Sequence, residues 1–204
     1  MKTHLLNRRS VLQQLTLAVG VGMLGTSRAF AGTVGAVNNL QGPKPLIIAP
    51  GGGEKGSFGG VDAIFKLDKS QTASNLGVVE MTLKPGHLAA PPHLHHSFDE
   101  VCYLQEGTLH VMIGKEVTEI QAGSWHIRPR GIIHTFWNSG KTPAKVIELY
   151  TPGGFETYLK GLAKLFKENP NPPAPKIQGL AAKYDMVIHF ELLQVIMDKY
   201  QVHL

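Results

Sequence analysis

Between residues 61 and 150 the chain alternates hydrophobic and polar positions with a period of two, the pattern of β-strands that bury one face. The inward positions of the first two runs are Val61, Ala63, Phe65 and Leu67, then Val79, Met81 and Leu83. Further strands are predicted at 100–105, 108–113, 116–120, 124–128, 133–137 and 144–150. Short Gly, Pro and Asn turns separate them without intervening helices. We therefore expect an all-β fold, an antiparallel sandwich or barrel.

After Pro152 the hydrophobic period becomes that of an α-helix. The apolar positions are Phe155, Tyr158, Leu159, Leu162, Leu165 and Phe166. They predict a helix that packs one face on the outside of the barrel. Residues 169–175, rich in proline, are typical of a stiff extended linker. Residues 180–187 are loosely echoed by 195–202, which we interpret as a small duplication that gives two short helices.

The first 31 residues have the composition of an export signal. Arg8 and Arg9 precede an uncharged stretch at 10–27, and a small-x-small sequence ends at Ala31. Glycines and polar residues make this stretch only weakly apolar, which fits a signal better than a membrane span. We expect cleavage after Ala31 and no stable membrane insertion afterwards, with an uncleaved anchor as the alternative.

Residues 32–60 are rich in Gly and Pro and are interpreted as an N-terminal arm. The run Leu46-Ile47-Ile48 predicts one strand that lies on the barrel or on a neighbouring subunit, so a homodimer is a candidate assembly. The glycines at 51–53 are interpreted as a flexible turn, because the Lys-Ser/Thr of a phosphate-binding loop does not follow. The expected organisation is a signal at 1–31, an arm at 32–60, a barrel at 61–152 and a C-terminal helical extension at 153–204.

Removal of the signal changes the charge of the protein. The chain of 204 residues has a formal charge of +5, and basic residues of the signal supply four of these charges. The 173 residues that remain carry +1 and suffice for one domain with its own core. The charge is therefore no argument for nucleic acid, and we expect no such partner. The single cysteine, Cys102, excludes an internal disulfide.

Four potential metal ligands lie in the strand region. His93 and His95 are two residues apart, so both imidazoles point to one face of a strand, and Glu100 follows across a short turn. His134 lies on a later strand. Three imidazoles and a carboxylate suit one divalent transition metal ion per chain, whether Fe, Mn, Cu, Ni or Zn. Four protein ligands leave coordination positions open, which is typical of a catalytic site.

The spacing of these residues resembles the two sequence motifs of the cupin superfamily. The first motif is carried by Gly86, His93, His95, Glu100 and Gly107, and the second by Gly123, Pro129, Gly131, His134 and Asn138. Within that superfamily the chain resembles small single-domain proteins similar to quercetin 2,3-dioxygenase, because Pro85-Gly86, the prolines at 91–92 and residues 151–156 also look like that group. The resemblance covers about residues 46 to 165. It implies a jelly-roll barrel in which His93, His95, Glu100 and His134 bind the metal.

The paired arginines also carry a resemblance. Residues 7–12, Asn-Arg-Arg-Ser-Val-Leu, resemble a twin-arginine export signal. Such signals imply export of an already folded protein, which allows metal loading in the cytoplasm. We therefore expect an exported protein, periplasmic or extracellular.

Other residues are candidates for a substrate pocket beside the metal. Cys102 shares a strand face with Glu100, with core packing as its alternative role. Phe136 is a candidate wall of an apolar pocket. His126 and Arg128 are two residues apart on one strand. If they face inward, they offer an acid or base and an anion clamp for an acidic substrate.

Three functions fit these observations. The first is a metal-dependent dioxygenase similar to quercetinase, in which the metal binds a phenolic or enol oxygen of a small-molecule substrate, dioxygen is the second reactant and Glu100 is the catalytic base. The second is an exported protein that binds or senses a small ligand without turnover. The third is a decarboxylase or isomerase that uses the metal as a Lewis acid. The motifs specify fold and metal more strongly than reaction.

Overall fold

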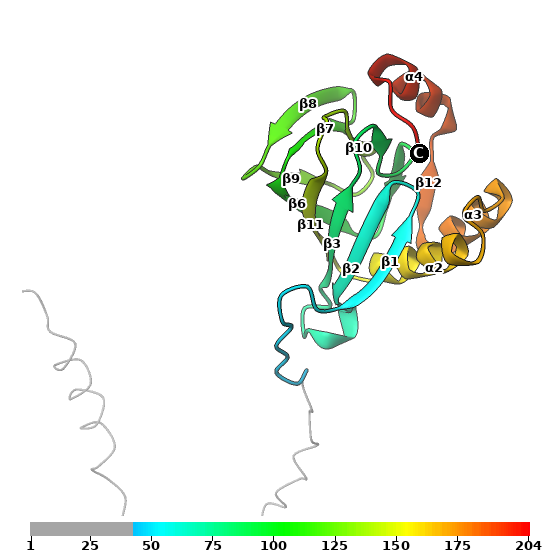
Figure 1. Cartoon of the computed structure of the whole chain (residues 1–204). Helices are drawn as coiled ribbons and strands as arrows, with labels where there is room; N and C mark the ends of the chain where they lie inside the picture. Colours follow the sequence, from blue (N-terminus) through cyan, green and yellow to red (C-terminus); the bar gives the residue numbers. More distant parts are fainter. Residues whose placement is uncertain (1–42) are drawn as a thin grey trace, which may run out of the picture. The chain divides into compact units, whose positions relative to one another are not determined.

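The computed structural model describes residues 43–204. The expected signal at 1–31 and residues 32–42 of the expected arm lie outside this part of the chain. The described residues form two antiparallel β-sheets, with three α-helices in the C-terminal part of the chain (Figure 1). No helix within 43–204 is both long and apolar enough to cross a membrane.

The first sheet has the strand order β1-β2-β3-β11-β6-β9. Its strands are β1 (Glu54–Phe58), β2 (Val61–Leu67), β3 (Gly77–Leu83), β11 (Ala144–Thr151), β6 (Asp99–Glu106) and β9 (Trp125–Arg128). Along β3, alternate residues are buried, including Val79, Met81 and Leu83. The period of two in the sequence is therefore the burial period of the strand.

The second sheet has the strand order β12-β5-β10-β7-β8, with β4 also paired to β10. Its strands are β12 (Met186–Ile188), β5 (His93–His95), β10 (His134–Asn138), β7 (Thr108–Ile113), β8 (Glu116–Gln121) and β4 (His87–Leu88). Gly114 and Lys115 form a two-residue turn between β7 and β8. Gly114 has φ 62°, a conformation that favours glycine.

The two sheets enclose one core to which both contribute. Among its fully buried members are Val79, Leu104, Leu109, Ala144 and Val146. The predicted all-β, antiparallel jelly-roll class with C-terminal helices is confirmed. The predicted strands at 61–67 and 108–113 match β2 and β7 residue for residue, and the others differ at their ends.

The strand expected at Leu46–Ile48 is wrong. Residues 43–49 form no strand, and Ile47 is 96% exposed. Prolines at 43, 45 and 50 surround this run and cannot donate to a strand ladder, which disfavours pairing. The strand of the arm is β1, which pairs with β2. It was missed because Glu-Lys-Gly-Ser-Phe has no alternation of apolar residues.

The interpretation of the C-terminal segment also needs correction. The linker ends earlier than expected, because helix α3 (Ala174–Ala181) begins inside it with a proline in its first turn, where the missing N–H has no helical partner to lose. Residues 180–187 are not a helix that repeats 195–202. They contain the end of α3, the short 3-10 helix η2 (Ala182–Tyr184) and most of β12, whereas 195–202 lies largely in α4 (Phe190–Tyr200). The sheets therefore extend on both sides of the range 61–152 expected for the barrel.

Helix α2 (Phe155–Glu168) confirms the predicted helical period, but its apolar face does not simply cover the outside of the barrel. Phe155, Tyr158 and Leu159 are buried and line an internal cavity, while the helix packs beside β1 (Figure 1). Helix α4 covers an outer face instead, where its Ile196 joins Trp137 of β10 in a second apolar cluster. One helix thus shapes the interior and the other shields a strand that carries a candidate ligand.

Candidate metal centre

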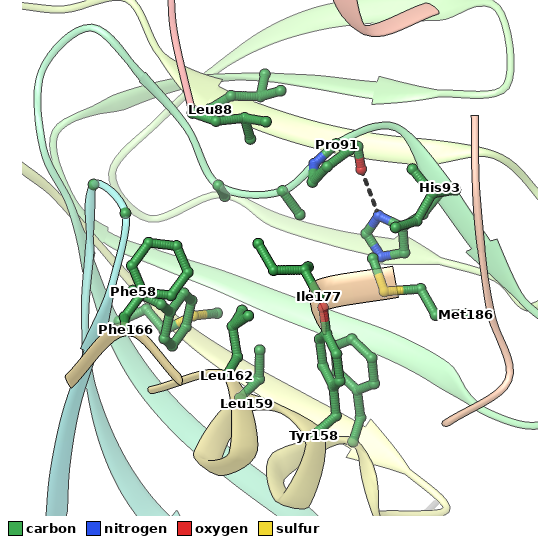
Figure 2. Close-up of a pocket in the computed structure, with 18 of the residues that line it drawn as sticks. Phe58, Leu88, Pro91, His93, Tyr158, Leu159, Leu162, Phe166, Ile177 and Met186 are labelled. Atoms are coloured by element: carbon green, nitrogen blue, oxygen red, sulfur yellow. Dashed lines mark hydrogen bonds between the residues drawn. The ribbon is translucent and has the colours of Figure 1, made fainter. Parts of the chain in front are cut away.

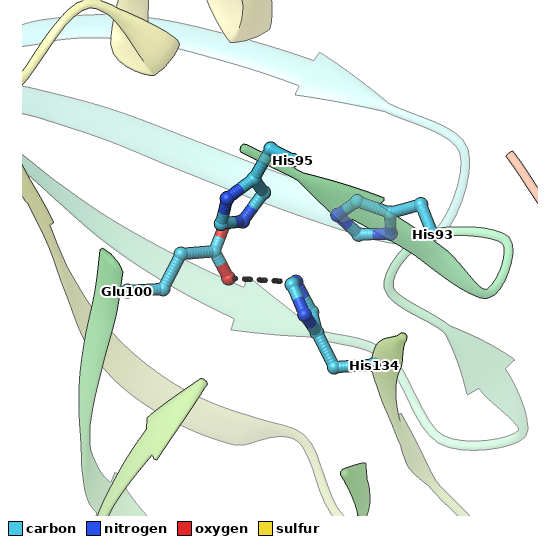
Figure 3. A group of neighbouring side chains, drawn as sticks. All are labelled: His93, His95, Glu100 and His134. Atoms are coloured by element: carbon cyan, nitrogen blue, oxygen red, sulfur yellow. Dashed lines mark ion pairs between the residues drawn. The ribbon is translucent and has the colours of Figure 1, made fainter. Parts of the chain in front are cut away.

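Four side chains from three strands meet between the two sheets. His93 and His95 point inward from β5, His134 lies directly opposite His93 on β10, and Glu100 reaches across from β6 of the other sheet. Their candidate ligand atoms all lie within 4.8 Å of one another, and all four residues are at most 3% exposed. Figure 3 shows the carboxylate of Glu100 turned toward the rings of His95 and His134. The four residues singled out in the sequence are therefore brought to one point.

Backbone carbonyls orient two of the imidazoles. The Nδ1 atom of His93 lies 2.8 Å from the carbonyl oxygen of Pro91, and that of His134 lies 2.8 Å from the carbonyl oxygen of Ile132. A carbonyl only accepts, so Nδ1 carries the proton and donates it in each ring. The Nε2 lone pair of each ring then faces the centre of the cluster. This is the arrangement in which a ligating histidine is held by a second hydrogen bond.

The electrostatics of the cluster favour a cation. Burial, followed by the neighbouring His134, lowers the pKa of His93 to about 3, so this imidazole is neutral near pH 7. Burial alone would raise the pKa of Glu100, but the charge of the Arg128 guanidinium holds it well below its usual range. A neutral imidazole and an ionised carboxylate thus present lone pairs to the same point.

These residues fit a bound metal ion. The Nε2 atoms of His93, His95 and His134 are buried and have no hydrogen-bond partner within the described part of the chain. Buried polar atoms are almost always satisfied, so three such nitrogens facing one carboxylate require an explanation, and a shared cation supplies it. Four buried His and Glu residues are therefore positioned to bind one metal ion, whose identity the mixed nitrogen and oxygen set does not specify.

A cavity of about 390 Å³ opens onto the ligand cluster. His93 and Glu100 belong to its wall, and Figure 2 shows His93 beside Pro91 among the residues that line the cavity. Most of the remaining wall is apolar: Phe58, Met81, Leu88, Phe136, Phe155, Leu159, Leu162, Phe166, Ile177, Met186 and Ile188. Its size lies within the range of small-molecule sites, and its lining has the same apolar character as theirs.

The structure separates the four pocket candidates into two pairs. Phe136 and Arg128 line the cavity, and the Arg128 guanidinium lies 4.8 Å from the centre of the Phe136 ring. Cys102 on β6 and His126 on β9 are paired with each other, two residues along their strands from the pair Glu100 and Arg128. Neither Cys102 nor His126 is among the residues of the cavity wall. Cys102 is fully buried in the core, and burial raises the pKa of its thiol.

The guanidinium of Arg128, the candidate anion clamp, is paired with carboxylates inside the barrel. Its Nη2 atom lies 3.0 Å from Oε2 of Glu100 and also forms an ion pair with Glu148. All three side chains are at most 3% exposed. The positive charge of Arg128 is therefore already matched by buried carboxylates, and none remains for an acidic substrate.

Glu148 is the polar residue that the sequence interpretation missed. It lies on β11, opposite Cys102 and between the buried positions Val146 and Tyr150, where an apolar residue is the default. A glutamate in the apolar phase of a predicted strand was the available signal. Burial, with the charge of Glu100 nearby, raises the pKa of Glu148, although Arg128 opposes the change. The cavity residues of α2 and β12 gave no comparable signal, because a helical stripe shows that a face is buried and not what it faces.

The comparisons with known proteins agree with this architecture. Residues 79–150 match the family model described as Cupin domain. The chain is 33% identical over 110 residues to germin-like protein 5-1 of Oryza sativa subsp. japonica, covering 50% of this chain and 49% of that protein. It is 28% identical over 115 residues to nectarin-1 of Nicotiana langsdorffii x Nicotiana sanderae, covering 52% and 48%. The chain thus spans about half the length of the curated relatives it matches.

A solved structure from a bacterium is also similar. The protein described as a sugar phosphate isomerase from a cupin superfamily, of Silicibacter pomeroyi DSS-3, shares 23% identity, covers 52% of this chain and 75% of its own, and gives a TM-score of 0.46. The matched segment 79–150 runs from β3 to β11 and includes all four candidate ligands. Residues 79–150 therefore form a domain of the cupin superfamily.

Proposed function

We propose that this protein is a metal-dependent oxidoreductase of the dioxygenase type that acts on a small, largely apolar substrate with a phenolic or enol oxygen. The observation that carries the proposal is the continuity between the apolar cavity and the four-ligand cluster, which share His93 and Glu100. A substrate bound among apolar side chains presents its polar oxygen to the cluster, since most of the cavity wall is apolar.

The charge of the cavity favours this substrate class over sugar phosphates and other anions. Among the described residues of its wall, Arg128 is the one Lys or Arg side chain, and it is already paired with Glu100 and Glu148. An isomerase for phosphorylated sugars needs a cation or a row of donors for the phosphate. Two alternative functions are also compatible with the cavity: a ligand-binding protein without turnover, and a non-oxidative enzyme that acts on a neutral substrate.

Residues of this chain supply orientation and a proton acceptor. When bound, the metal would polarise a substrate oxygen and, if redox-active, take part in electron transfer. Glu100 is positioned to accept the proton of that oxygen on its carboxylate, since Arg128 keeps the group ionised. A low pKa also makes this carboxylate a weak base, so the proton transfer requires a substrate oxygen that has become more acidic in the site. The apolar wall excludes water from the same region.

Residues 1–31 motivate a further part of the proposal, which is that the protein works outside the cytoplasm. Arg8 and Arg9 and the small-x-small sequence ending at Ala31 support export. Such a protein meets small phenolic compounds and dioxygen directly. Fractionation of cells that express the full chain tests this point.

The experiment that tests the function has two steps. Elemental analysis of the purified protein identifies the metal, and oxygen consumption is then measured with flavonols, catechols and 1,3-diketones. We expect about one redox-active ion per chain and oxygen uptake with at least one compound. His134→Ala protein serves as the metal-poor control. If zinc is the only metal, no dioxygen is consumed and the substrate is converted to an isomer or releases CO₂, the protein is a non-oxidative enzyme. If the substrate binds and no product forms, the protein is a ligand-binding protein.

A further inference from the structure

The inner end of the cavity contains polar atoms that the metal centre does not use. Glu148 and Arg128 both belong to the cavity wall, and both are at most 2% exposed. Oε2 of Glu148 pairs with Nη2 of Arg128, but Oε1 of Glu148 and Nε of Arg128 have no hydrogen-bond partner among the described residues. The thiol of Cys102, a weak donor, lies opposite Glu148 on the paired strand.

An unpartnered acceptor and an unpartnered donor, on two side chains that pair through their other atoms, define what can bind there. Buried carboxylate and guanidinium atoms are rarely left without a partner, since they have given up their hydration. A hydroxyl group donates and accepts at once, so it can satisfy Glu148 Oε1 and Arg128 Nε together. A carboxylate or phosphate cannot donate, and it would meet two glutamates around one arginine.

The position of these atoms relates them to the metal centre. A single nitrogen, Nη2 of Arg128, contacts both Glu148 and Glu100, so the polar pair lies next to the ligand cluster. Phe136 supplies an apolar surface over the same guanidinium. A flat aromatic ligand whose first oxygen reaches the cluster therefore brings a neighbouring substituent to Glu148 and Arg128.

We propose that Glu148 and Arg128 form a hydroxyl-binding subsite, so that the preferred substrates are uncharged aromatic compounds with a second hydroxyl beside the metal-directed oxygen. This inference rests on the proposed function for its substrate class. It adds a specificity-determining pair that is separate from the four ligands. It also reverses the expectation that Arg128 selects acidic substrates.

Matched naphthalene ligands test the subsite by binding alone. Isothermal titration calorimetry compares 2-naphthol, 2,3-dihydroxynaphthalene and 3-hydroxy-2-naphthoate, without oxygen, on the protein as purified and after chelator treatment. We expect the diol to bind about tenfold or more tighter than 2-naphthol, and the carboxylate to bind no better than 2-naphthol. Because a diol can also chelate a metal, the preference must persist in the chelator-treated protein.

Variants assign the preference to the subsite. Glu148→Leu removes both oxygens and is expected to bring the ratio of diol to 2-naphthol affinity close to one. Glu148→Gln, the variant for use if the leucine protein does not fold, is expected to lower that ratio at least threefold, on the order of one weakened hydrogen bond. Phe166→Leu, at another part of the cavity wall, is the matched control: it changes the affinity for both ligands and leaves their ratio unchanged.

The outcomes separate the subsite from the function on which it rests. Equal binding of 2-naphthol and the diol, or a ratio that Glu148→Leu does not change, overturns the subsite and leaves the apolar-substrate proposal standing. Tighter binding of the carboxylate overturns it in favour of an anion site. No measurable binding of any of the three ligands overturns the proposed substrate class, and the subsite with it.

Discussion

Arg128 and Glu100 form an ion pair inside the barrel, with Nη2 of the arginine 3.0 Å from Oε2 of the glutamate and neither side chain more than 3% exposed. The pair joins a candidate metal ligand to a residue on the neighbouring strand β9. The arginine also contacts Glu148, which holds its guanidinium in place. The guanidinium in turn holds the carboxylate of Glu100. The position of that carboxylate therefore depends on a residue outside the ligand set.

Replacing this arginine should be costly. Arg128→Met leaves two buried carboxylates without their cation, and we expect a loss of about 3–5 kcal/mol in the free energy of unfolding. Urea denaturation at neutral pH measures the loss. Arg130→Met is the matched control, since Arg130 pairs with Asp99 at the surface, where solvent screens the charges and such pairs contribute little to stability. Equal losses for the two variants would show that the buried pair does not hold the barrel together.

Removing a histidine ligand should empty the site and leave the barrel folded. His93→Ala or His134→Ala is expected to weaken metal affinity by about 100-fold or more. The reason is that mutation of residues that only hydrogen-bond to metal ligands already lowers metal affinity about 10- to 100-fold. Elemental analysis measures metal content and circular dichroism checks the fold. His96→Ala is the control: this neighbour of His95 is exposed and should retain metal. A His93 variant that does not fold would make the metal structural and count against a catalytic site.

Glu100→Gln separates the two roles of this residue. The amide keeps an oxygen of similar reach, so we expect weaker but measurable metal binding. An amide cannot accept the substrate proton, and loss of one general-base step costs about 10²- to 10⁴-fold in turnover. The loss should become smaller at high pH, where the substrate arrives deprotonated. Metal content and turnover measured together across pH provide the test, and activity that falls only in proportion to metal would leave Glu100 as a ligand alone.

His126 makes the protein sensitive to acid. Burial, followed by the charge of Arg128, lowers its pKa to about 3, and both ring nitrogens lack partners among the described residues. The unfolded chain binds this proton near pH 6.5, so the contribution to stability is complete above pH 6.5 and is lost as pH falls toward 3. Between pH 7 and pH 5 this histidine should lower the free energy of unfolding by about 2 kcal/mol. His126→Leu should reduce the fall in unfolding free energy by that amount, and parallel pH curves for the two proteins would contradict the prediction.

Export should depend on the paired arginines. Lysine at both Arg8 and Arg9 preserves charge but removes the pair that a receptor reads, so the precursor is expected to stay in the cytoplasm. Immunoblots of cell fractions distinguish precursor from mature protein by size. Normal processing of the double-lysine chain would indicate the general secretory route or the absence of a signal.

The alternation of hydrophobic and polar residues predicted the all-β class, whereas the convergence of the four candidate ligands was implied by the resemblance to the cupin motifs. Strand alternation fixes which residues share a face, so His93 and His95 had to point the same way and His134 had to face the core with Phe136. Such a local rule needs no knowledge of the partner strand.

The features that could not be predicted depend on long-range contacts. Whether Arg128 meets a substrate or Glu148 depends on β11, which lies 16 residues or more further along the chain. The inward face of α2 and the pairing of β12 with β5 likewise follow from packing between distant segments. Leu46–Ile48 shows the opposite error, an apolar run whose prolines prevent the strand that its hydrophobicity favours.

The pairing of β12 with β5 sets an order of events during synthesis. His93 and His95 lie on a three-residue strand, and one side of that strand is completed only by Met186–Ile188, more than 90 residues later. While the nascent chain is emerging from the ribosome, both histidines can be outside the exit tunnel for many seconds before the strand that flanks them exists, at about 5–20 residues per second. The strand that carries both histidines therefore gains its full set of backbone hydrogen bonds only after residue 188 has been made, so its geometry is complete only once the chain has nearly been finished.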